Sequence, residues 1–408
     1  MKTRKQNLLA VIISSLCLIF VSSMHVEGQE EESNETIIDS LRRKTPSGQY
    51  VDPASFFRFH GYVSLSYAEP GEELGGLGGT PQILIGGPKG GFRNDSALFV
   101  GGEPFDGVSS VIELHFVGDA SNPVITEAKL IWDIIESDEG KPFTFRLVGG
   151  RYWWPFGIHN DEWFSAVNRF HLLSPVASEV VPPHYNEVGI MAEGEIKLAN
   201  RFGANYVFSV GNGVPGFELM PNVRGTTADT NSNRALTGRV GFVLQRDFNL
   251  EAGFSVAFGD LRDGPMVEAP TDPLHYAADF VAMGPDVVLK WKGVGLRGYY
   301  YVSEENLAEA PQDTLDRHGF TVEPSYTFNL ESLESRYLKA ITLLGRFSSA
   351  DEDKLDGKTV RRLQYGIGAN VDITNTFHAK LGYIIQGEEE DASEIDNDVF
   401  SVSLTAEF

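Results

Sequence analysis

Apolar and polar residues alternate at every second position along most of this chain. At its carboxyl end, Phe400, Val402, Leu404, Ala406 and Phe408 are separated by Ser401, Ser403, Thr405 and Glu407. A period of two places these two sets on opposite faces of a β-strand. A strand of this kind needs an apolar environment on one face and a polar environment on the other.

The same alternation recurs in sixteen segments, each of about ten residues, the length with which a tilted strand crosses a bilayer. The expected strands are 57–67, 95–103, 109–117, 124–136, 143–151, 187–197, 202–211, 235–245, 248–259, 279–291, 294–303, 318–328, 338–348, 360–373, 376–387 and 397–408. Two of them have interrupted patterns. Segment 95–103 is rich in glycine, and Leu338 and Leu344 break the alternation of 338–348.

The connections between these segments are sorted by length. Short ones fall at Asn200-Arg201, Arg246-Asp247, Lys292-Gly293 and Thr374-Asn375. Long polar ones fall at 68–94, 152–186, 212–234, 260–278, 304–317, 349–359 and 388–396, and 118–123 is short where a long loop is expected. Transmembrane barrels have short periplasmic turns and long outer loops, whereas a soluble sandwich has no reason to sort its loops in this way. The sequence therefore predicts an all-β fold, a transmembrane antiparallel up-and-down β-barrel of about sixteen strands over residues 56–408.

The amino terminus has the pattern of an export signal. Lys2, Arg4 and Lys5 precede the apolar run 8–21, and the small-residue pattern Val26-Glu27-Gly28 follows. We therefore expect a signal peptide over 1–28, then a periplasmic segment over 29–55, then a barrel in the outer membrane. The chain's single cysteine, Cys17, lies inside the expected signal, which leaves the exported protein without a disulfide or a thiolate nucleophile.

Two local motifs flank the longest predicted loop, 152–186. The stretch Gly149-Gly150-Arg151-Tyr152-Trp153-Trp154-Pro155-Phe156-Gly157 opens it, and His184-Tyr185-Asn186-Glu187-Val188-Gly189-Ile190-Met191 closes it. Together they resemble the porin family that includes the phosphate-selective porins O and P. This resemblance implies a loop that folds into the lumen and narrows the pore, and a homotrimeric assembly. The last strand, which ends in the aromatic Phe408, resembles the segment recognised by the barrel assembly machinery.

The predicted pore residues follow from this loop and from the alternation. The candidates for the constriction are charged and imidazole side chains within this loop or directly before it: Arg151, Arg169, Asp161, Glu162, His159 and His171. Carboxylates stand beside the basic groups there, so phosphate selectivity does not follow. Charges on the lipid face are costly, and the polar face should therefore line the lumen with Arg58, His60, Lys129, Arg146, Arg239, Arg297, Arg362, Lys380, Glu113, Glu127 and Glu193. Packing against the wall is the expected role of Trp153, Trp154, Phe156 and Trp163.

The formal net charge of −24 disfavours nucleic-acid binding. Much of the acidic excess lies in 304–317, 349–359 and 388–396, where solvated loop tips and contacts to lipopolysaccharide through divalent cations are both open interpretations. Asp351–Gly357 resembles a calcium loop only loosely because its glycine is one position late. We expect no metal and no cofactor.

The predicted function is passive diffusion of small hydrophilic solutes or ions through an outer-membrane porin without enzymatic activity. Two alternatives remain open. One is a barrel enzyme, a phospholipase or protease, although serine, histidine and carboxylate positions show no recognisable catalytic spacing. The other is a plugged structural or adhesive barrel.

Overall fold

The computed structural model describes residues 58–70, 91–105, 107–117, 124–135, 142–158, 168–170, 174–181, 186–213, 234–259, 277–307, 314–330, 338–353, 359–389 and 398–408. The chain divides into Met1–Ser40 and Leu41–Phe408, and all sixteen strands belong to the second unit. The expected signal peptide 1–28 and periplasmic segment 29–55 lie outside the described residues.

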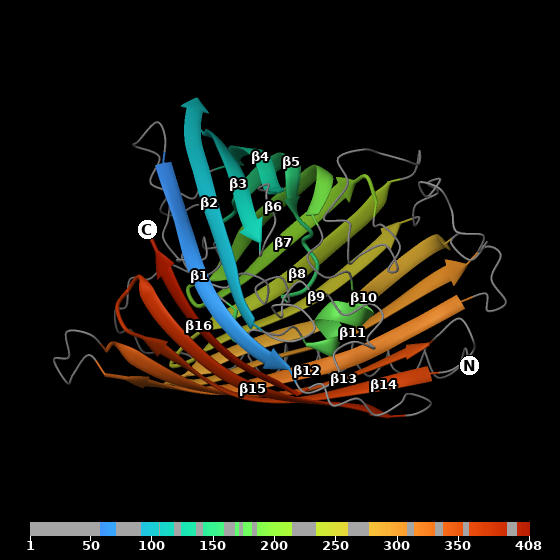
Figure 1. Cartoon of the computed structure of the whole chain (residues 1–408). Coiled ribbons are helices and arrows are strands. Elements are labelled where there is room, and N and C mark those ends of the chain that lie inside the picture. Colours follow the sequence, from blue (N-terminus) through green and yellow to red (C-terminus); the bar gives the residue numbers. More distant parts are fainter. Residues whose placement is uncertain are drawn as a thin grey trace. The chain divides into compact units, whose positions relative to one another are not determined.

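Sixteen antiparallel strands form one closed barrel (Figure 1). They are β1 Arg58–Pro70, β2 Gly91–Phe105, β3 Val108–Val117, β4 Val124–Ile135, β5 Phe145–Trp153, β6 Asn186–Ala199, β7 Phe202–Gly211, β8 Ala235–Gln245, β9 Asn249–Gly259, β10 Ala277–Trp291, β11 Val294–Leu307, β12 Thr314–Asn329, β13 Ala340–Asp353, β14 Thr359–Asp372, β15 Phe377–Glu389 and β16 Val399–Glu407. Each strand pairs with its neighbours in sequence, and β1 pairs with β16. The predicted up-and-down barrel and all sixteen predicted strands are confirmed.

The short turn between β10 and β11 has the geometry that its sequence favours. Lys292 and Gly293 both have positive φ, 46° and 86°, between β10 and β11. Positive φ at both central residues defines the primed turn whose twist matches that of the flanking strands. A side chain at Gly293 would also approach the carbonyl oxygen of Thr327, 2.7 Å from an ideal Cβ. The sequence predicted this turn correctly.

Two predicted loops are shorter than expected because strands extend into them. β11 continues to Leu307 and β12 begins at Thr314, while β13 continues to Asp353. The acidic runs expected at the loop tips of 304–317 and 349–359 thus lie partly on strands. Ion pairs bridge these extensions: Arg317 lies 3.2 Å from Glu305 on β11 and 3.4 Å from Glu352 on β13. Paired charges therefore allow strand hydrogen bonding to continue past the apolar part of the wall.

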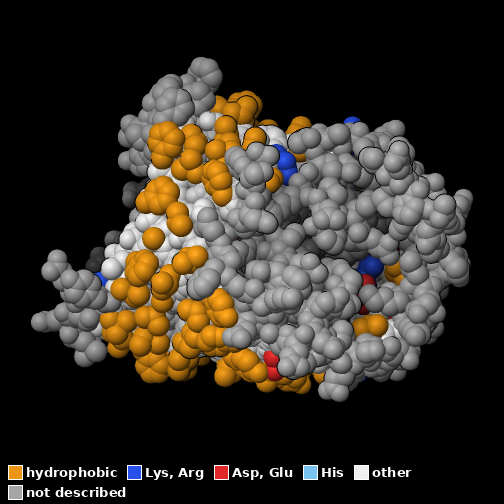
Figure 2. Space-filling model, in the orientation of Figure 1, with side chains coloured by type: hydrophobic (Ala, Val, Ile, Leu, Met, Phe, Trp, Pro, Cys, Tyr) orange, Lys and Arg blue, Asp and Glu red, His pale blue; other side chains and the backbone are white. Residues whose placement is uncertain are grey.

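The outer face of the barrel is apolar and the inner face is polar. Phe59, Val63 and Leu65 are exposed on β1, whereas Ser64 and Ser66 are buried. Apolar side chains gather on the outer wall of the strands (Figure 2). A β-bulge in β4 shifts the alternation by one residue: Ile125 is exposed, and both Thr126 and Glu127 are buried. The bulge explains how Glu127 faces inward two residues after an outward-facing isoleucine.

The end of the chain closes the seam of the barrel. The backbone N–H groups of Gly61 and Phe408 each donate to the other residue's carbonyl oxygen at 3.0 Å. The Phe408 ring lies over Gly61, whose ideal Cβ would stand 2.8 Å from the ring. Glycine is therefore required on β1 where this terminal aromatic packs.

Within the described residues, one short π-helix, η4 (Val176–Val180), interrupts the strands and lies inside the barrel (Figure 1). No helix in this part of the chain is long and apolar enough to cross a membrane.

Candidate functional site: the barrel lumen and segment 152–186

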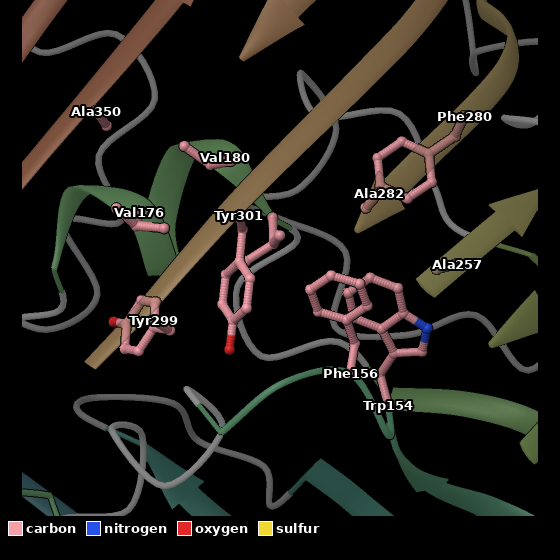
Figure 3. Packing of buried hydrophobic residues seen from close by; sticks show 11 residues of the cluster. Trp154, Phe156, Val176, Val180, Ala257, Phe280, Ala282, Tyr299, Tyr301 and Ala350 are labelled. Atoms are coloured by element: carbon pink, nitrogen blue, oxygen red, sulfur yellow. The ribbon is translucent and has the colours of Figure 1, made fainter. Parts of the chain in front are cut away.

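The described parts of 152–186 pack against the inner wall on the side of β9–β13 (Figure 3). Trp154, Phe156, Val176 and Val180 are each fully buried and form a cluster with wall residues. The wall contributes small and aromatic side chains to this cluster, namely Ala257, Phe280, Ala282, Tyr299, Tyr301 and Ala350. A small core thus lies inside the barrel, where a purely hydrophilic lumen would have none. The predicted packing roles of Trp154 and Phe156 are confirmed.

Aromatic contacts dominate this internal core. The Trp154 and Phe156 rings stack with centroids 4.7 Å apart, and Phe156 meets Tyr301 edge-on at 5.1 Å. Tyr301 in turn stacks on Tyr299 at 4.9 Å. Both stacked and edge-to-face arrangements are favourable for aromatic pairs. The rings therefore fix the first limb of the segment, 153–158, to the wall.

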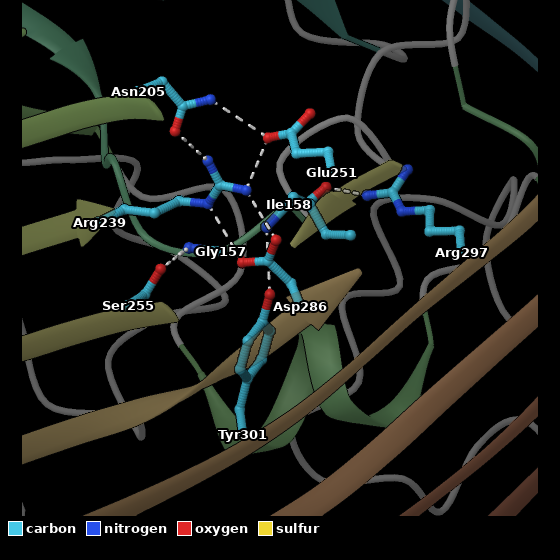
Figure 4. A network of polar contacts seen from close by, with 9 residues as sticks. All are labelled: Gly157, Ile158, Asn205, Arg239, Glu251, Ser255, Asp286, Arg297 and Tyr301. Carbon is cyan, nitrogen blue, oxygen red and sulfur yellow. Dashed lines mark hydrogen bonds and ion pairs between the residues drawn. The ribbon is translucent and has the colours of Figure 1, made fainter. Parts of the chain in front are cut away.

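Polar wall residues satisfy the backbone of this first limb (Figure 4). The Gly157 N–H donates to Ser255 Oγ at 2.9 Å, and the Ile158 N–H donates to the Tyr301 hydroxyl at 3.1 Å. Arg297 donates to the Ile158 carbonyl oxygen. Trp154 Nε1 donates to Thr237 Oγ1 at 2.7 Å. Backbone groups away from water need such partners, so these inward side chains make the docking specific.

A second limb, 168–170, contacts β12–β15. The Phe170 ring lies over three inward glycines, since ideal Cβ atoms at Gly366, Gly368 and Gly382 would come within 3.1, 3.2 and 3.8 Å of it. The Arg346 guanidinium covers the ring at 4.6 Å from its centroid, a cation–π contact. Lys380 Nζ donates to the Asn168 carbonyl oxygen at 2.8 Å and to its side-chain oxygen at 2.9 Å. The glycines make room for an aromatic side chain that the flanking cations hold.

A third limb, 174–181, contains η4 and contacts β11–β14. Ser174 Oγ and the Tyr299 hydroxyl lie 2.6 Å apart, and Glu179 pairs with Arg362. Val176 occupies the space left by Gly319, where an ideal Cβ would stand 2.8 Å from the valine side chain. All three limbs therefore share contacts with the wall from β8 to β15.

The inner wall of β4–β10 carries a group of charged residues that we call the acidic belt: Asp133, Arg146, Glu193, Arg239, Glu251 and Asp286. Strand register places Asp133, Arg146 and Glu193 in one row, which continues through Val207 to Arg239. Arg146 Nε donates to Asp133 at 2.9 Å, and its NH1 group donates to Glu193 at 3.5 Å. Arg239 donates to Asp286 at 2.7 and 3.1 Å and to Glu251 at 2.8 Å (Figure 4). Four carboxylates thus face two guanidinium groups.

The wall of β1–β4 holds two further buried polar groups. Asp95 and His115 Nε2 lie 2.5 Å apart, and the Tyr62 hydroxyl lies 3.4 Å from the same nitrogen. In the second group, Glu113 and Glu127 are register partners on β3 and β4. Trp153 Nε1 donates to Glu113 at 3.2 Å, and Lys129 donates to Glu127 at 2.7 Å. No cluster of three or more metal-ligating side chains occurs among the residues that the structure describes.

The candidate constriction residues fall mostly outside the described residues: this holds for His159, Asp161, Glu162 and His171. Arg169 is described and lies 3.9 Å from Glu323. Arg151 is half-buried, and its register partners are Ala128 and Val188, positions that alternate with the inward-facing Glu127 and Glu187. Of the six constriction candidates, the structure thus describes Arg151, on β5, and Arg169, beside Glu323 on β12.

Most of the predicted lumen residues are described and make polar contacts on the inner face. Lys129, Arg146, Arg239, Arg297, Arg362, Lys380, Glu113, Glu127 and Glu193 all make polar contacts with the inner wall or with the segment 152–186. His60 stacks on Phe99 at 6.0 Å, and the side chain of Arg58 lies outside the described residues. Sequence reasoning missed Arg346 and Asp95, which lie in the two segments with interrupted alternation. The apolar Phe347 next to Arg346 was a usable signal, because an outward-facing aromatic residue places its neighbour on the inner face. In the structure Phe347 is exposed on the outer wall.

Comparison with protein-family models and with curated proteins gives no match. Among solved structures, the chain is similar to an anion-selective porin from Comamonas acidovorans, with a TM-score of 0.56 at 11% identity over 86% of this chain and 99% of the porin. The trimer form of OmpT, an outer-membrane protein of Vibrio cholerae, gives 0.53 at 11% identity over 86% and 99%. The outer-membrane channel DcaP of Acinetobacter baumannii gives 0.51 at 10% identity over 86% and 97%. At these identities the likeness establishes the fold alone, and that fold is a closed porin-type β-barrel.

Proposed function

We propose that this protein is an outer-membrane channel through which small hydrophilic solutes or ions diffuse passively. The observation that carries the proposal is the opposite chemistry of the two faces of one closed barrel. Large apolar side chains are exposed around the outside, whereas charged and hydroxyl side chains line the inside. Lipid can cover the first surface, and water with dissolved solute suits the second.

Segment 152–186 is the proposed constriction. Its described limbs occupy part of the lumen and are fixed to the wall by rings and hydrogen bonds, so the passage is narrower than the bare barrel. Most contacts that its described limbs make lie on β8–β15, and Trp153 adds hydrogen bonds to Glu113 on β3 and Glu127 on β4. A rigidly docked constriction sets an upper limit on the size of the solutes.

The same proposal covers location and assembly. The segment 1–28 directs export, and the strand that ends at Phe408 is recognised during insertion. The apolar outer wall then contacts membrane lipid and lipopolysaccharide. A homotrimer is supported by the trimer form of the similar OmpT structure.

Liposome swelling with sugars of increasing size tests the proposal. Folded protein in liposomes is expected to admit small sugars and to exclude large ones. Entry of no solute into liposomes that contain folded, inserted barrels would instead support a plugged barrel.

A barrel enzyme is the second candidate, and the Asp95–His115 pair is the observation that favours it. The pair lies near the start of β2 and the end of β3, and an aspartate that orients a histidine is part of many hydrolytic sites. Hydrolysis of phospholipid or peptide that is lost in His115→Ala but kept in His60→Ala would establish this function.

A further inference from the structure

We infer that the channel passes cations in preference to anions, because segment 152–186 bonds the cations on the basic side of the lumen and leaves three carboxylates of the acidic belt, those of Asp133, Glu193 and Glu251, in contact with water. This inference rests on the proposed channel function and adds the class of solute that the channel favours. It concerns the electric field of the lumen and not a cation site with fixed coordination.

The basic side of the lumen lies on β11–β15. Its cations are Arg297, Arg346, Arg362 and Lys380, and Arg169 of the docked segment joins them. Each makes a contact that directs it toward the segment or a carboxylate: Arg297 bonds the Ile158 carbonyl oxygen, Arg362 pairs with Glu179, and Lys380 bonds Asn168. Arg346 lies 2.6 Å from Glu323 and covers Phe170. These groups hold the constriction in place, so they contribute little to binding a mobile anion.

Three of the four carboxylates of the acidic belt retain contact with water, whereas Asp286 is buried against Arg239. The side chains of Asp133, Glu193 and Glu251 are 30, 23 and 28% exposed. Of the two belt arginines, Arg146 is 38% exposed and Arg239 only 10%. The part of the belt that reaches water therefore holds three carboxylates against one guanidinium group.

Neighbouring charges on the same wall do not reverse this balance. Lys129 is paired with Glu127 at 2.7 Å, and Glu195 and Lys197, which face inward farther along β6, contribute one charge of each sign. Lys290, exposed near the end of β10, adds one cation, which leaves carboxylates in excess on this wall. Charge of one sign within low-dielectric walls concentrates counter-ions in the water between them. The belt should therefore raise the concentration of cations along β4–β9.

The test is the reversal potential of membranes held across a KCl gradient, measured for the full chain, for two single belt variants and their double variant, and for one control variant. Glu193→Gln leaves Arg146 paired with Asp133, and Glu251→Gln leaves Arg239 paired with Asp286. Neither substitution therefore leaves an arginine without a carboxylate partner. Asp247→Asn, in the exposed turn between β8 and β9, is the matched control because it removes the same charge outside the lumen.

We expect a reversal potential displaced toward that of K⁺ for the parent protein. Each belt substitution should lower the K⁺ concentration beside the belt about two- to threefold, the effect of a unit charge acting across about 8 Å of water, and should lower the K⁺/Cl⁻ permeability ratio by at least that factor because Cl⁻ responds in the opposite sense. The control should leave the ratio unchanged. If the parent conducts but prefers Cl⁻, or if the Glu193→Gln/Glu251→Gln double variant keeps the parental permeability ratio, the inferred cation preference is wrong and the proposed channel function stands. A folded parent that passes no current overturns the proposed channel and this inference with it.

Discussion

Phe156→Ala should loosen the constriction while leaving the barrel intact. The Phe156 ring is fully buried, stacks on Trp154 and meets Tyr301 edge-on, so the substitution removes the centre of the internal core. Truncation of a buried phenylalanine to alanine costs about 3–5 kcal/mol. This loss of free energy weakens docking of the segment and does not affect strand pairing. Because about 1.4 kcal/mol corresponds to a tenfold change in an equilibrium constant, the undocked fraction should rise by about two to three and a half powers of ten. The hydrogen bonds to Gly157 and Ile158 and the limbs at 168–181 limit this to transient release.

Single-channel recording and limited proteolysis measure the effect. We expect larger current fluctuations, a higher mean conductance and faster cleavage within 152–186, with an unchanged shift between heated and unheated protein on a gel. Phe208→Ala is the matched control because it removes the same atoms from an outward position that is 53% exposed on β7. Parental conductance, noise and cleavage rate in Phe156→Ala would refute the reasoning that these rings hold the segment.

Three further substitutions test other parts of the account. Gly366→Val should displace Phe170, because the new Cβ would stand 3.1 Å from its ring and 3.2 Å from Arg346 Cβ, and proteolysis within 152–186 should accelerate relative to Gly387→Val, whose site is open. Gly293→Val should lower the urea midpoint of unfolding, because φ of 86° strains a branched residue by about 1–3 kcal/mol; Lys292→Asn, which tolerates positive φ, should not. Leu65→Arg should lower the free energy of unfolding in lipid vesicles by about 2–4 kcal/mol, the cost of a charge on the lipid face at the middle of the bilayer. Leu65→Phe should leave this free energy almost unchanged.

The strands could be predicted because their signal is local. A period of two with an apolar set on one side needs only the residues of one strand, and the turn at Lys292-Gly293 needs only two. The signal fails where the inner face itself is apolar. Leu344 is apolar although it lies at an inward-facing position, where it is buried, and it obscured the alternation around Arg346. The lengths of β11–β13 were underestimated because ion pairs such as Arg317–Glu305 maintain pairing beyond the apolar part.

The docking of 152–186 could not be derived from local pattern. Trp154, Gly157 and Ile158 bond Thr237, Ser255 and Tyr301, which are separated from them by 83, 98 and 143 positions. The resemblance suggested an inward loop without saying which wall it would contact. The cations Arg297, Arg362 and Lys380 were predicted to line the lumen, and the structure shows them bonded to the segment, a set of partners that the sequence did not indicate. Only the closed barrel, which brings distant strands around one lumen, reveals this use of the charges.

Single-channel recording of the purified, folded protein in planar bilayers tests the central claim most directly. The account predicts stepwise current increases, each a stable open channel, under conditions in which the unheated protein migrates as a folded barrel. Folded protein that inserts into the bilayer, as judged by protection of its strands from protease, and that never conducts would contradict a water-filled channel.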